Sequence, residues 1–280
     1  MTKNIQAILT IAGSDPSGGA GIQADLKTMV VLGAYGCAAV TSLTVQNTLG
    51  VQSCHPVEPD LVYQQVTAVL SDLTVTHVKI GMIGSTAIAQ AIVQALNGFA
   101  GEIIYDPIVF TSVGQPVRAT DSLEGIRQIT GIASVLTPNI NELRLISGDS
   151  CTSTDDVLRA GQGLLNAFPN LKALAIKGGH LHEDQAEVTD FLLIPGQPEP
   201  LSRTHRRIVS TNTHGTGCTF ASALAAYHQR TGDYRQAFNQ SIDFLDSLLS
   251  VSANWRLGHG NGGLSHHLFG LAAVQQPSMN

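Results

Sequence analysis

Short apolar segments alternate along the chain with longer segments in which apolar residues recur every three to four positions. This alternation is typical of βαβ units, which build a mostly parallel sheet. Several of the short segments are apolar throughout, as strands covered on both faces should be. We therefore expect an α/β fold whose central sheet is mostly parallel and carries helices on both faces.

The boundaries of the expected elements follow from the same pattern. The expected strands are 7–12, 38–44, 77–80, 103–105, 134–137, 173–176, 187–194 and 208–210. The expected helices are 21–31, 60–70, 86–96, 140–146, 155–167, 218–229 and 234–250. No linker rich in Pro or Ser interrupts them, so residues 1–258 are predicted to form a single domain. Residues 259–280 are rich in Gly and His, and we expect an irregular tail there.

Composition and charge restrict the class of protein. Of the 280 residues, 43% are hydrophobic, which provides ample material for a core and argues against intrinsic disorder. Only 13% are charged, about half of the usual share of roughly 25%, so we expect much buried chain or a surface covered by a partner, and specifically a homodimer. The net charge of −6 and the lack of a long basic run argue against a nucleic-acid ligand.

The sequence also indicates a compartment. It contains four cysteines, which are Cys37, Cys54, Cys151 and Cys218. Their irregular spacing indicates neither a disulfide framework nor a zinc site. Residues 28–57 contain no Asp, Glu, Lys or Arg, but glycines interrupt them too often for a membrane helix. The apolar run at residues 7–13 is short and is soon followed by Asp15, which favours a first strand over a signal peptide. We expect a cytoplasmic protein that does not enter a membrane.

A glycine-rich turn, Gly13 to Gly21, follows the first strand and opens the first helix. It is not a P-loop, because Gly19 and Ala20 stand where that motif requires Lys and then Ser or Thr. Residues 19–24 match the G-x-G-x-x-A dinucleotide fingerprint, but no acid follows the next strand to hold a ribose. The turn therefore favours a loop around a small neutral substrate. A dinucleotide site and a close-packed turn without a ligand are the alternatives.

A second glycine-rich turn, residues 212–219, follows a late strand and opens a helix rich in small residues. Successive backbone N–H groups at a helix N-terminus attract anions, and the helix dipole adds partial positive charge. We therefore predict an anion hole formed by Gly215, Thr216 and Gly217. Cys218 lies in the first turn, where the same field is expected to lower the pKa of its thiol. The alternative is a buried cysteine that only packs.

Three further groups follow successive strands, at the edge where an open α/β sheet has its ligand crevice. They are Asp106, the pair Asn139 and Glu142, and Lys177. The oxygen-bearing side chains suit Mg²⁺, and the lysine suits a phosphate. Each group also has a plainer interpretation, which is a turn residue, a helix capping box and a solvated strand end, respectively. Their coincidence with the anion hole predicts Mg²⁺-nucleotide chemistry.

Two other clusters carry less weight. The basic stretch 203–207 is interpreted as a solvated sheet edge. The histidines His259, His266 and His267 could bind a metal, but no Cys or acid accompanies them in helical spacing. We therefore assign these histidines to the irregular tail.

Together, these motifs closely resemble those of the hydroxymethylpyrimidine/phosphomethylpyrimidine kinases of thiamine biosynthesis, which belong to the ribokinase-like superfamily. The matching strings are 11–28, 46–48, 79–82, 106–107, 137–142, 177–180 and 213–218. The likeness extends over roughly residues 8–258, and the first and last strings are the most specific. It implies a ribokinase-like fold, ATP as the phosphate donor and Mg²⁺ as cofactor. The implied substrates are 4-amino-5-hydroxymethyl-2-methylpyrimidine and then its monophosphate, giving the diphosphate.

The resemblance also implies roles on the substrate side of the site. Gln46 would hold the edge of the pyrimidine. Gly13, Ala20 and Met82 would line the same pocket, and His214 would bind the substrate as well. Some members of the family carry Glu where this chain has Gln46, and Gln can present both a donor and an acceptor to an aminopyrimidine.

On the nucleotide side, Cys218 stands where other members of the superfamily have an aspartate base, directly after the anion hole. Asn139 and Glu142 would organise Mg²⁺, and Asp106 would contact both metal and nucleotide. Lys177 would lie on the nucleotide side. Residues 108–114 depart from the family, whose members usually carry a Ser-Gly-Asp type of turn there.

Three other functions are considered. Pyridoxal kinase has the same fold, but the string at 46–48 favours the aminopyrimidine. A non-catalytic pyrimidine sensor would be favoured by loss of the anion hole, the metal acid or the lysine, and this chain has all three. A nicotinamide dehydrogenase would need the missing ribose acid.

Overall fold

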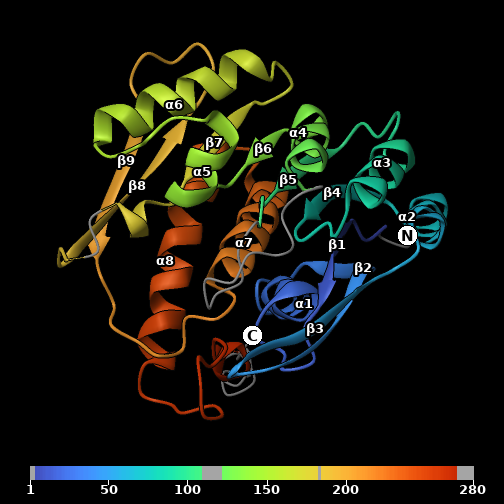
Figure 1. Ribbon diagram of the computed structural model, residues 1–280, viewed down its shortest axis with the longest axis horizontal. Helices are drawn as coiled ribbons and strands as arrows, with labels where there is room; N and C mark the ends of the chain where they lie inside the picture. Colours follow the sequence, from blue (N-terminus) through green and yellow to red (C-terminus); the bar gives the residue numbers. More distant parts are fainter. Residues whose placement is uncertain (1–3, 109–121, 182–183, 270–280) are drawn as a thin grey trace, which may run out of the picture.

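The computed structural model describes residues 4–108, 122–181 and 184–269. The described residues form a nine-stranded sheet in the order β3-β2-β1-β4-β5-β6-β7-β8-β9, with helices packed on both faces (Figure 1). Residues 109–114, where the sequence departs from the resembled family, lie outside the described part.

Most of the elements follow one another as the apolar pattern predicts. The strands are β1 (Ala7–Ser14), β2 (Tyr35–Asn47), β3 (Gly50–Pro56), β4 (Val75–Ile80), β5 (Glu102–Tyr105), β6 (Val135–Leu136), β7 (Ala173–Ile176), β8 (Glu187–Leu193) and β9 (Leu201–Arg206). The helices are α1 (Gly21–Val31), α2 (Pro59–Asp72), α3 (Thr86–Ala95), α4 (Ser122–Ile132), α5 (Ile140–Ser147), α6 (Thr154–Ala167), α7 (Thr216–Thr231) and α8 (Tyr234–Ser252). A short 3₁₀ helix, η1 (Gly178–His180), follows β7.

The centre of the sheet is parallel. Strands β2, β1, β4, β5, β6 and β7 pair in parallel, whereas β3 at one edge and β8 and β9 at the other pair antiparallel. This confirms the prediction of a mostly parallel α/β sheet. It also brings the carboxyl ends of the parallel strands to one edge, where ligand sites form in such folds.

Two apolar layers hold the helices to the sheet. Helices α2 to α6 pack on one face, with side chains such as Ile92 and Leu143 buried against the strands. Helices α1, α7 and α8 pack on the other face, where the rings of Phe220 and Phe238 meet edge to face at 6.3 Å between centroids. Central strands such as β7 are therefore buried throughout their length, which explains their continuous apolar sequence.

The sheet edges differ most from the prediction. The predicted strand 208–210 is wrong, because the edge strand is β9, which contains most of the basic stretch 203–207. Its residues alternate between half-buried and exposed, and acidic partners compensate its charges, as in the ion pair of Arg203 with Asp243 at 2.5 Å. Strand β3 and helix α4 were not predicted. In the part of the chain that the structure describes, no helix is long and apolar enough to cross a membrane.

The segment after residue 258 is not a detached tail. Within the predicted irregular tail 259–280, most of residues 259–265 lack regular secondary structure, but residues 266–269 are helical. Residues 262–266 are buried against the domain. The cause is that Gly262 and Gly263 run beside the turn at His214, with a parallel bridge between Gly263 and His214.

A partly buried chain of ion pairs joins the antiparallel end of the sheet to α8. His205 on β9 lies between two carboxylates, with Nδ1 2.9 Å from Asp246 Oδ2 and Nε2 3.3 Å from Asp190 Oδ2. Asp190 Oδ1 accepts a hydrogen bond of 2.7 Å from the backbone N–H of Gly178, directly after Lys177. Burial alone would lower the pKa of His205, but the two carboxylates raise it to about 9. His205 is therefore protonated at neutral pH and supports the loop after β7.

This chain of ion pairs predicts a specific loss of stability at alkaline pH. Because the folded pKa of about 9 lies above the unfolded value of about 6.5, the stabilisation is complete below pH 6.5 and disappears as the pH rises through about 9. Thermal denaturation of the wild type and of His205→Gln should show the wild type as more stable at about pH 6, with a difference that closes toward about pH 10. A difference that is independent of pH would mean that His205 is not protonated in the folded protein.

Candidate active site

The two glycine-rich turns meet at the N-termini of α1 and α7. Gly215 is the N-cap of α7 and has φ of 83°, a conformation that favours glycine. A Cβ at this position would lie only 1.8 Å from the backbone oxygen of Gly19. The two turns, which the sequence analysis treated separately, therefore form one continuous wall.

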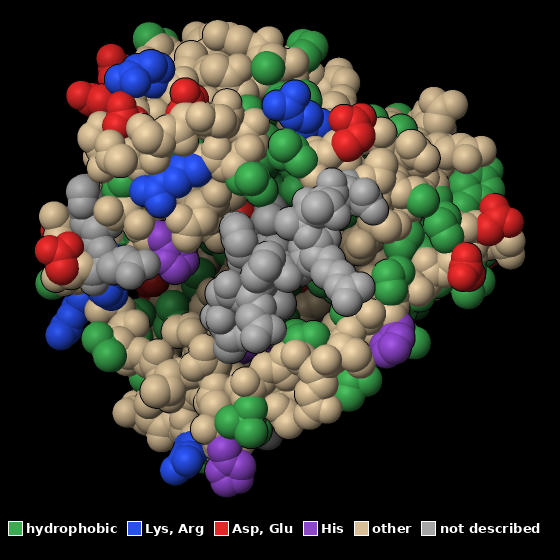
Figure 2. Space-filling view, viewed as in Figure 1, with side chains coloured by type: hydrophobic (Ala, Val, Ile, Leu, Met, Phe, Trp, Pro, Cys, Tyr) green, Lys and Arg blue, Asp and Glu red, His purple; other side chains and the backbone are tan. Residues whose placement is uncertain are grey.

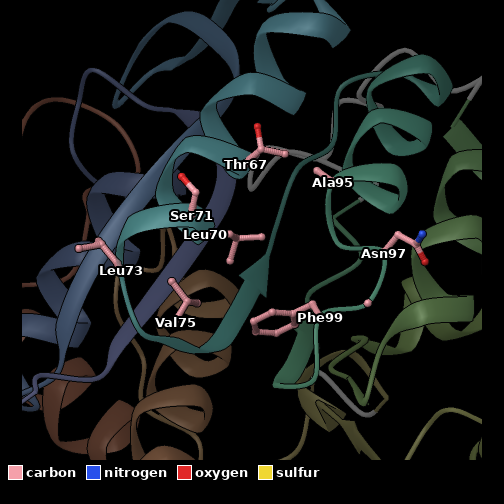
Figure 3. A pocket seen from close by; sticks show the side chains of 9 residues that line it. Thr67, Leu70, Ser71, Leu73, Val75, Ala95, Asn97 and Phe99 are labelled. Atoms are coloured by element: carbon pink, nitrogen blue, oxygen red, sulfur yellow. The ribbon is translucent and has the colours of Figure 1, made fainter.

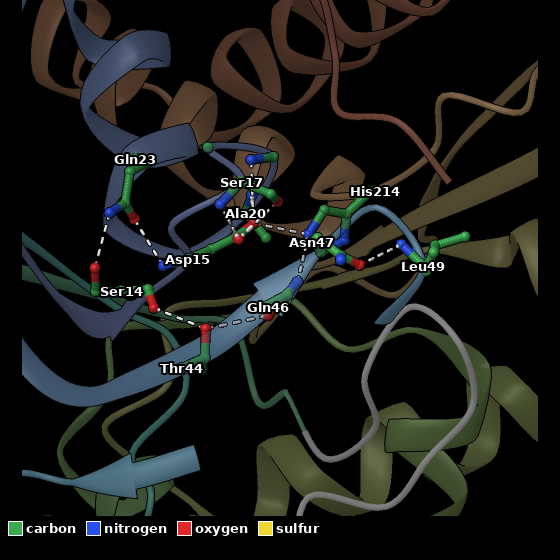
Figure 4. Close-up of polar contacts among 12 residues, drawn as sticks. Ser14, Asp15, Ser17, Ala20, Gln23, Thr44, Gln46, Asn47, Leu49 and His214 are labelled. Carbon is green, nitrogen blue, oxygen red and sulfur yellow. Dashed lines mark hydrogen bonds and ion pairs between the residues drawn. The ribbon is translucent and has the colours of Figure 1, made fainter. Parts of the chain in front are cut away.

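The carboxylate of Asp15 organises the first turn (Figure 4). Its Oδ1 accepts hydrogen bonds from the backbone N–H and the hydroxyl of Ser17, at 2.8 and 2.7 Å. Its Oδ2 accepts from the backbone N–H groups of Gly19 and Ala20, at 3.1 and 2.9 Å, and lies 2.8 Å from His214 Nε2. Asp15 is thus a buried anion with donors from both turns.

These donors determine the charge state of Asp15. Burial alone would raise its pKa, but hydrogen bonds from His214, Ser17 and Ala20 lower it to about 2. Asp15 was not among the residues predicted to bind a ligand. The available signal was the Asp15-Pro-Ser17 sequence, because Asp commonly accepts hydrogen bonds from the residues that follow it in a turn.

Gln46, His214 and Asp15 form a polar chain across the substrate side (Figure 4). Gln46 Nε2 lies 2.9 Å from His214 Nε2, the same ring nitrogen that contacts Asp15. A single ring nitrogen cannot donate to one group and accept from another at once. Because an ionised carboxylate only accepts, Asp15 requires the donor state at this nitrogen, which leaves the amide N–H of Gln46 available to a ligand.

The remaining residues predicted for the substrate side lie close by. Met82 packs directly on Gly13, where a Cβ would lie 2.4 Å from Met82 Cε. Ala20 is the N-cap of α1, next to Asp15. The structure therefore brings together all five residues of the predicted substrate side, which are Gly13, Ala20, Gln46, Met82 and His214.

A second cluster lies at the carboxyl ends of the central strands. Lys177 Nζ pairs with Asp106 Oδ1 at 2.7 Å and lies 4.0 Å from Glu142 Oε2. Thr137 also donates to Asp106 Oδ1, at 3.1 Å, whereas the buried Oδ2 has no hydrogen-bond partner among the described residues. Burial raises the pKa of Glu142 to about 7, with Lys177 opposing and Asp106 reinforcing the shift. Two buried carboxylates thus share one ammonium group.

Asn139 and Glu142 form the capping box at the start of α5. Asn139 Oδ1 accepts from the backbone N–H of Glu142 at 2.9 Å, and Glu142 Oε2 accepts from the backbone N–H of Asn139 at 2.7 Å. The plainer interpretation of this motif is therefore correct. It also has a consequence for the site, because the cap fixes the Glu142 carboxylate beside Lys177.

Cys218 lies in the first turn of α7, with Gly215, Thr216 and Gly217 before it. The thiol is buried, and burial raises its pKa to about 12, although the charge of Lys79 acts in the opposite direction. The expectation of a lowered pKa is wrong, because a buried thiolate loses more hydration than the helix N-terminus and nearby cation return. Cys218 is a neutral thiol at neutral pH.

A buried ion pair behind the site was also not predicted from the sequence. Lys79 on β4 contacts both oxygens of Asp25 on α1, at 2.9 and 3.0 Å, and both side chains are fully buried. Thr10 and Ser222 donate to the same carboxylate, at 2.6 and 2.8 Å. The signal was a lysine inside a predicted buried strand. The pair ties α1, α7 and the sheet together beneath the two turns.

Two other features of the surface are weaker candidates for a functional site. Figure 2 shows charged side chains scattered in small groups over the visible face, which is hollowed near its centre. A cavity of about 380 Å³ lies between the ends of α2 and α3 and the start of β4, lined by residues such as Leu70, Val75 and Phe99 (Figure 3). It lies at the amino end of β4, away from the two turns, and no charged side chain lines it.

Known proteins are similar to this chain in sequence and in fold. Residues 15–265 match the phosphomethylpyrimidine kinase family. The hydroxymethylpyrimidine/phosphomethylpyrimidine kinase of Escherichia coli K12 is 38% identical over 267 residues, covering 94% of this chain and 98% of that protein. Phosphomethylpyrimidine kinase from Clostridium difficile superimposes with a TM-score of 0.73 at 32% identity, over 87% of this chain and 99% of that one. An ADP complex of Bacillus subtilis pyridoxal kinase superimposes with a TM-score of 0.82 at 26% identity, over 96% of this chain and 100% of that one.

The buried, neutral thiol predicts low reactivity of Cys218. Because alkylation requires the thiolate, iodoacetamide at about pH 7.5 should label the exposed Cys54 and leave Cys218 unmodified. Mass spectrometry of tryptic peptides measures this, with protein unfolded in guanidinium as the control in which all four cysteines react. Rapid labelling of Cys218 in the folded protein would contradict the assignment.

Proposed function

The chain belongs to the phosphomethylpyrimidine kinase family, and we propose that it uses ATP to phosphorylate 4-amino-5-hydroxymethyl-2-methylpyrimidine and then its monophosphate in thiamine biosynthesis. The observation that carries this proposal is the chain Gln46–His214–Asp15 directly before the N-terminus of α7. This chain supports the proposal because the amide of Gln46 could recognise the polar edge of a ring next to the proposed site of the transferring phosphate.

Gln46 supplies the specificity in this proposal. An aminopyrimidine offers an amino donor beside a ring-nitrogen acceptor, and the two ends of an amide match that pair. Since Asp15 requires the donor state of His214, the amide N–H of Gln46 gains its best acceptor when the ring nitrogen of the substrate arrives. Gly13 and Met82 provide an apolar wall against the ring.

The N-terminus of α7 supports binding of the transferring phosphoryl group. A Cβ at Gly217 would lie 3.2 Å from Lys177 Nζ and 3.3 Å from Asp106 Oδ2, so the helix N-terminus and the lysine face the same small space. Backbone N–H groups and a lysine there would neutralise charge on the equatorial oxygens as the phosphoryl group passes to the substrate hydroxyl. Solved relatives of this fold bind nucleotides, such as ADP in the pyridoxal kinase from Staphylococcus aureus.

The residues around Asp106 fit a divalent cation. Its buried Oδ2 has no hydrogen-bond partner in the described residues, and Asp106 and Glu142 share Lys177 as their ion-pair partner. Hard oxygen ligands of this kind suit Mg²⁺. Asp106 and Glu142 would hold the ion, with Asn139 acting through the cap that places Glu142. The ion would supply further charge neutralisation for the phosphates of ATP.

Cys218 does not act as a thiolate base in this proposal, because burial keeps its thiol neutral. A loose transition state for phosphoryl transfer places little demand on a base, and most of the catalysis comes from alignment and charge neutralisation. We assign to the thiol the orientation of the substrate hydroxyl at the start of α7.

Pyridoxal phosphorylation is the second candidate, because the fold matches that of pyridoxal kinases closely. Gln46 distinguishes the two substrates. Pyridoxal presents a phenolic oxygen and an aldehyde at the corresponding edge, which would leave part of the amide unsatisfied, at a cost of about 1 to 3 kcal/mol.

We expect Gln46→Leu to reduce kcat/KM for the pyrimidine alcohol by about 10- to 100-fold and to leave KM for ATP within about twofold. The preference for the pyrimidine over pyridoxal should narrow, because the lost hydrogen bonds are the ones that distinguish the two rings. Steady-state kinetics with Mg-ATP and each substrate measures this, with Gln52→Leu as a control at an exposed position of the same hairpin. Unchanged discrimination would move specificity to the walls near Ala20 and Met82, and a wild type inactive on the pyrimidine would refute the proposed function.

The outer face of the β2–β3 hairpin supports a homodimer. Leu43, Val45 and Leu49 are 55, 49 and 67% exposed, and no ionisable Asp, Glu, Lys or Arg occurs from residue 28 to 57. An uncharged apolar edge is prone to pairing with another chain, which proteins normally prevent with charges. We propose a second copy of this chain as the partner.

The four unpaired cysteines support a reducing compartment, and we propose the cytoplasm.

The dimer proposal has a direct test. Size-exclusion chromatography with light scattering should give twice the chain mass of 29.4 kDa for the wild type and one chain mass for Val45→Glu, because burying a carboxylate in an apolar interface is costly. Val209→Glu is the control, since Val209 is 88% exposed and lies outside the hairpin. A wild-type monomer, or a Val45→Glu dimer, would refute this interface.

A further inference from the structure

The segment from Gly258 to His266, here called the C-terminal strap, passes three parts of the substrate side. It begins at Gly258, beyond the end of α8 at Ser252. It runs past the tip of the β2–β3 hairpin and the turn before α7, and ends between α1 and α7. The sequence pattern of Gly and His indicated only an irregular tail. Its contacts point to a more specific role.

The first contact is with the hairpin tip. Thr48 Oγ1 accepts hydrogen bonds from the backbone N–H groups of His259 and Gly260, both at 3.2 Å. A Cβ at Gly260 would lie 2.0 Å from the backbone oxygen of Thr48, so the two backbones meet without room for a side chain. Thr48 follows Gln46 by two residues. The strap therefore holds the end of the hairpin that carries Gln46, the residue proposed to bind the edge of the pyrimidine.

The second contact is with the two glycine-rich turns. The backbone N–H of His214 donates to the carbonyl oxygen of Gly262 at 3.1 Å. A Cβ at Gly263 would lie 2.7 Å from Gly19 Cα. The strap therefore presses against Gly19, whose own backbone N–H binds Asp15, and against His214, which binds the same carboxylate.

The third contact anchors the strap. His266 is 2% exposed, and its Nε2 lies 3.0 Å from Thr28 Oγ1 on α1 and 3.3 Å from Thr219 Oγ1 on α7. Its Nδ1 lies 3.1 Å from the carbonyl oxygen of Leu264. Because that carbonyl only accepts, Nδ1 carries the ring proton and Nε2 is an acceptor. The hydroxyl of Thr28 donates to the carbonyl oxygen of Ala24 at 2.8 Å, so Nε2 accepts from Thr219 and packs against Thr28. One side chain thus links the strap to both helices whose N-termini form the site.

The C-terminal end of the strap is also tied to the end of α8. The backbone N–H of Ser265 donates to Ser252 Oγ at 2.8 Å, and Asn212 Nδ2 donates to the carbonyl oxygen of Ser252 at 2.7 Å. The bonds to Thr48 near its start and the contacts of Ser265 and His266 at its end fix the strap on both sides, which makes it a rigid wall rather than a loose cover.

We propose that the C-terminal strap is the third wall of the substrate site and that His266 is a positioning residue, which holds the Gly19 and His214 turns and the Gln46 hairpin in the geometry that binds the pyrimidine. This proposal rests on the proposed function. The strap bonds to Thr48, His214 and the helices behind the turns, whereas the nucleotide cluster at Asp106 and Lys177 is built on the strand ends. Loss of the strap should therefore weaken binding of the pyrimidine and spare ATP.

The test compares two strap variants with two controls in the full chain. His266→Ala removes the anchor, and Gly263→Ala places a methyl group against Gly19. The controls are His267→Ala, at the exposed neighbouring position, and Gly163→Ala, where a Cβ meets no atom within 4 Å. Calorimetric titration with the pyrimidine alcohol gives Kd without turnover, steady-state kinetics give both KM values, and thermal denaturation reports folding.

Both strap variants should raise Kd and KM for the pyrimidine alcohol by about tenfold while KM for ATP changes by less than about twofold, and both controls should match the wild type. Strap variants that match the controls, that raise KM for ATP equally, or that fail to fold while both controls fold would overturn the positioning role. A wild type that binds the alcohol without phosphorylating it would refute only the proposed function. A wild type that does not bind the alcohol would overturn both.

Discussion

The buried carboxylate of Asp15 is the interaction on which the substrate side depends. A buried charge is tolerated only when hydrogen bonds replace its hydration. Its donors come from the turn before α1, at Ser17, Gly19 and Ala20, and from the turn before α7, at His214. The carboxylate therefore sets the distance between two helix N-termini, and that distance is short enough to require glycine at position 215.

On the nucleotide side, in contrast, the buried charges are not fully paired. Around Asp15 every charge has its partners, whereas around Asp106 two buried carboxylates share Lys177 and one carboxylate oxygen is unpaired among the described residues. The first arrangement fixes a shape for a neutral ring. The second leaves negative charge on the carboxylates that a bound cation would neutralise, and a site for a metal and a phosphate needs this property. The two halves of the site thus differ in electrostatics as their proposed ligands do.

Sequence reasoning succeeded where a local pattern determines the structure. Helix α1 and strand β7 have the predicted bounds, because continuous apolar runs and a glycine-rich helix start are local signals. It failed at the sheet edges, because the many polar residues of β3 and β9 are typical of loops. The raised pKa of Cys218 depends on burial that only the assembled fold creates. The partners of His266 lie 238 and 47 residues away, at Thr28 and Thr219, so nothing near it in sequence indicates its role.

This difference in sequence separation has a consequence for how the site forms. The carboxylates and the lysine of the nucleotide cluster lie on strands β5 to β7 and the turns that follow them, between residues 106 and 177. The substrate side needs the first turn, the hairpin, the turn before α7 and the strap, which span residues 13 to 266. Long-range contacts of this kind form only when most of the chain is folded, because their loop-closure entropy must be offset by the rest of the structure. The geometry that would distinguish one ring from another is therefore available only in the completed fold.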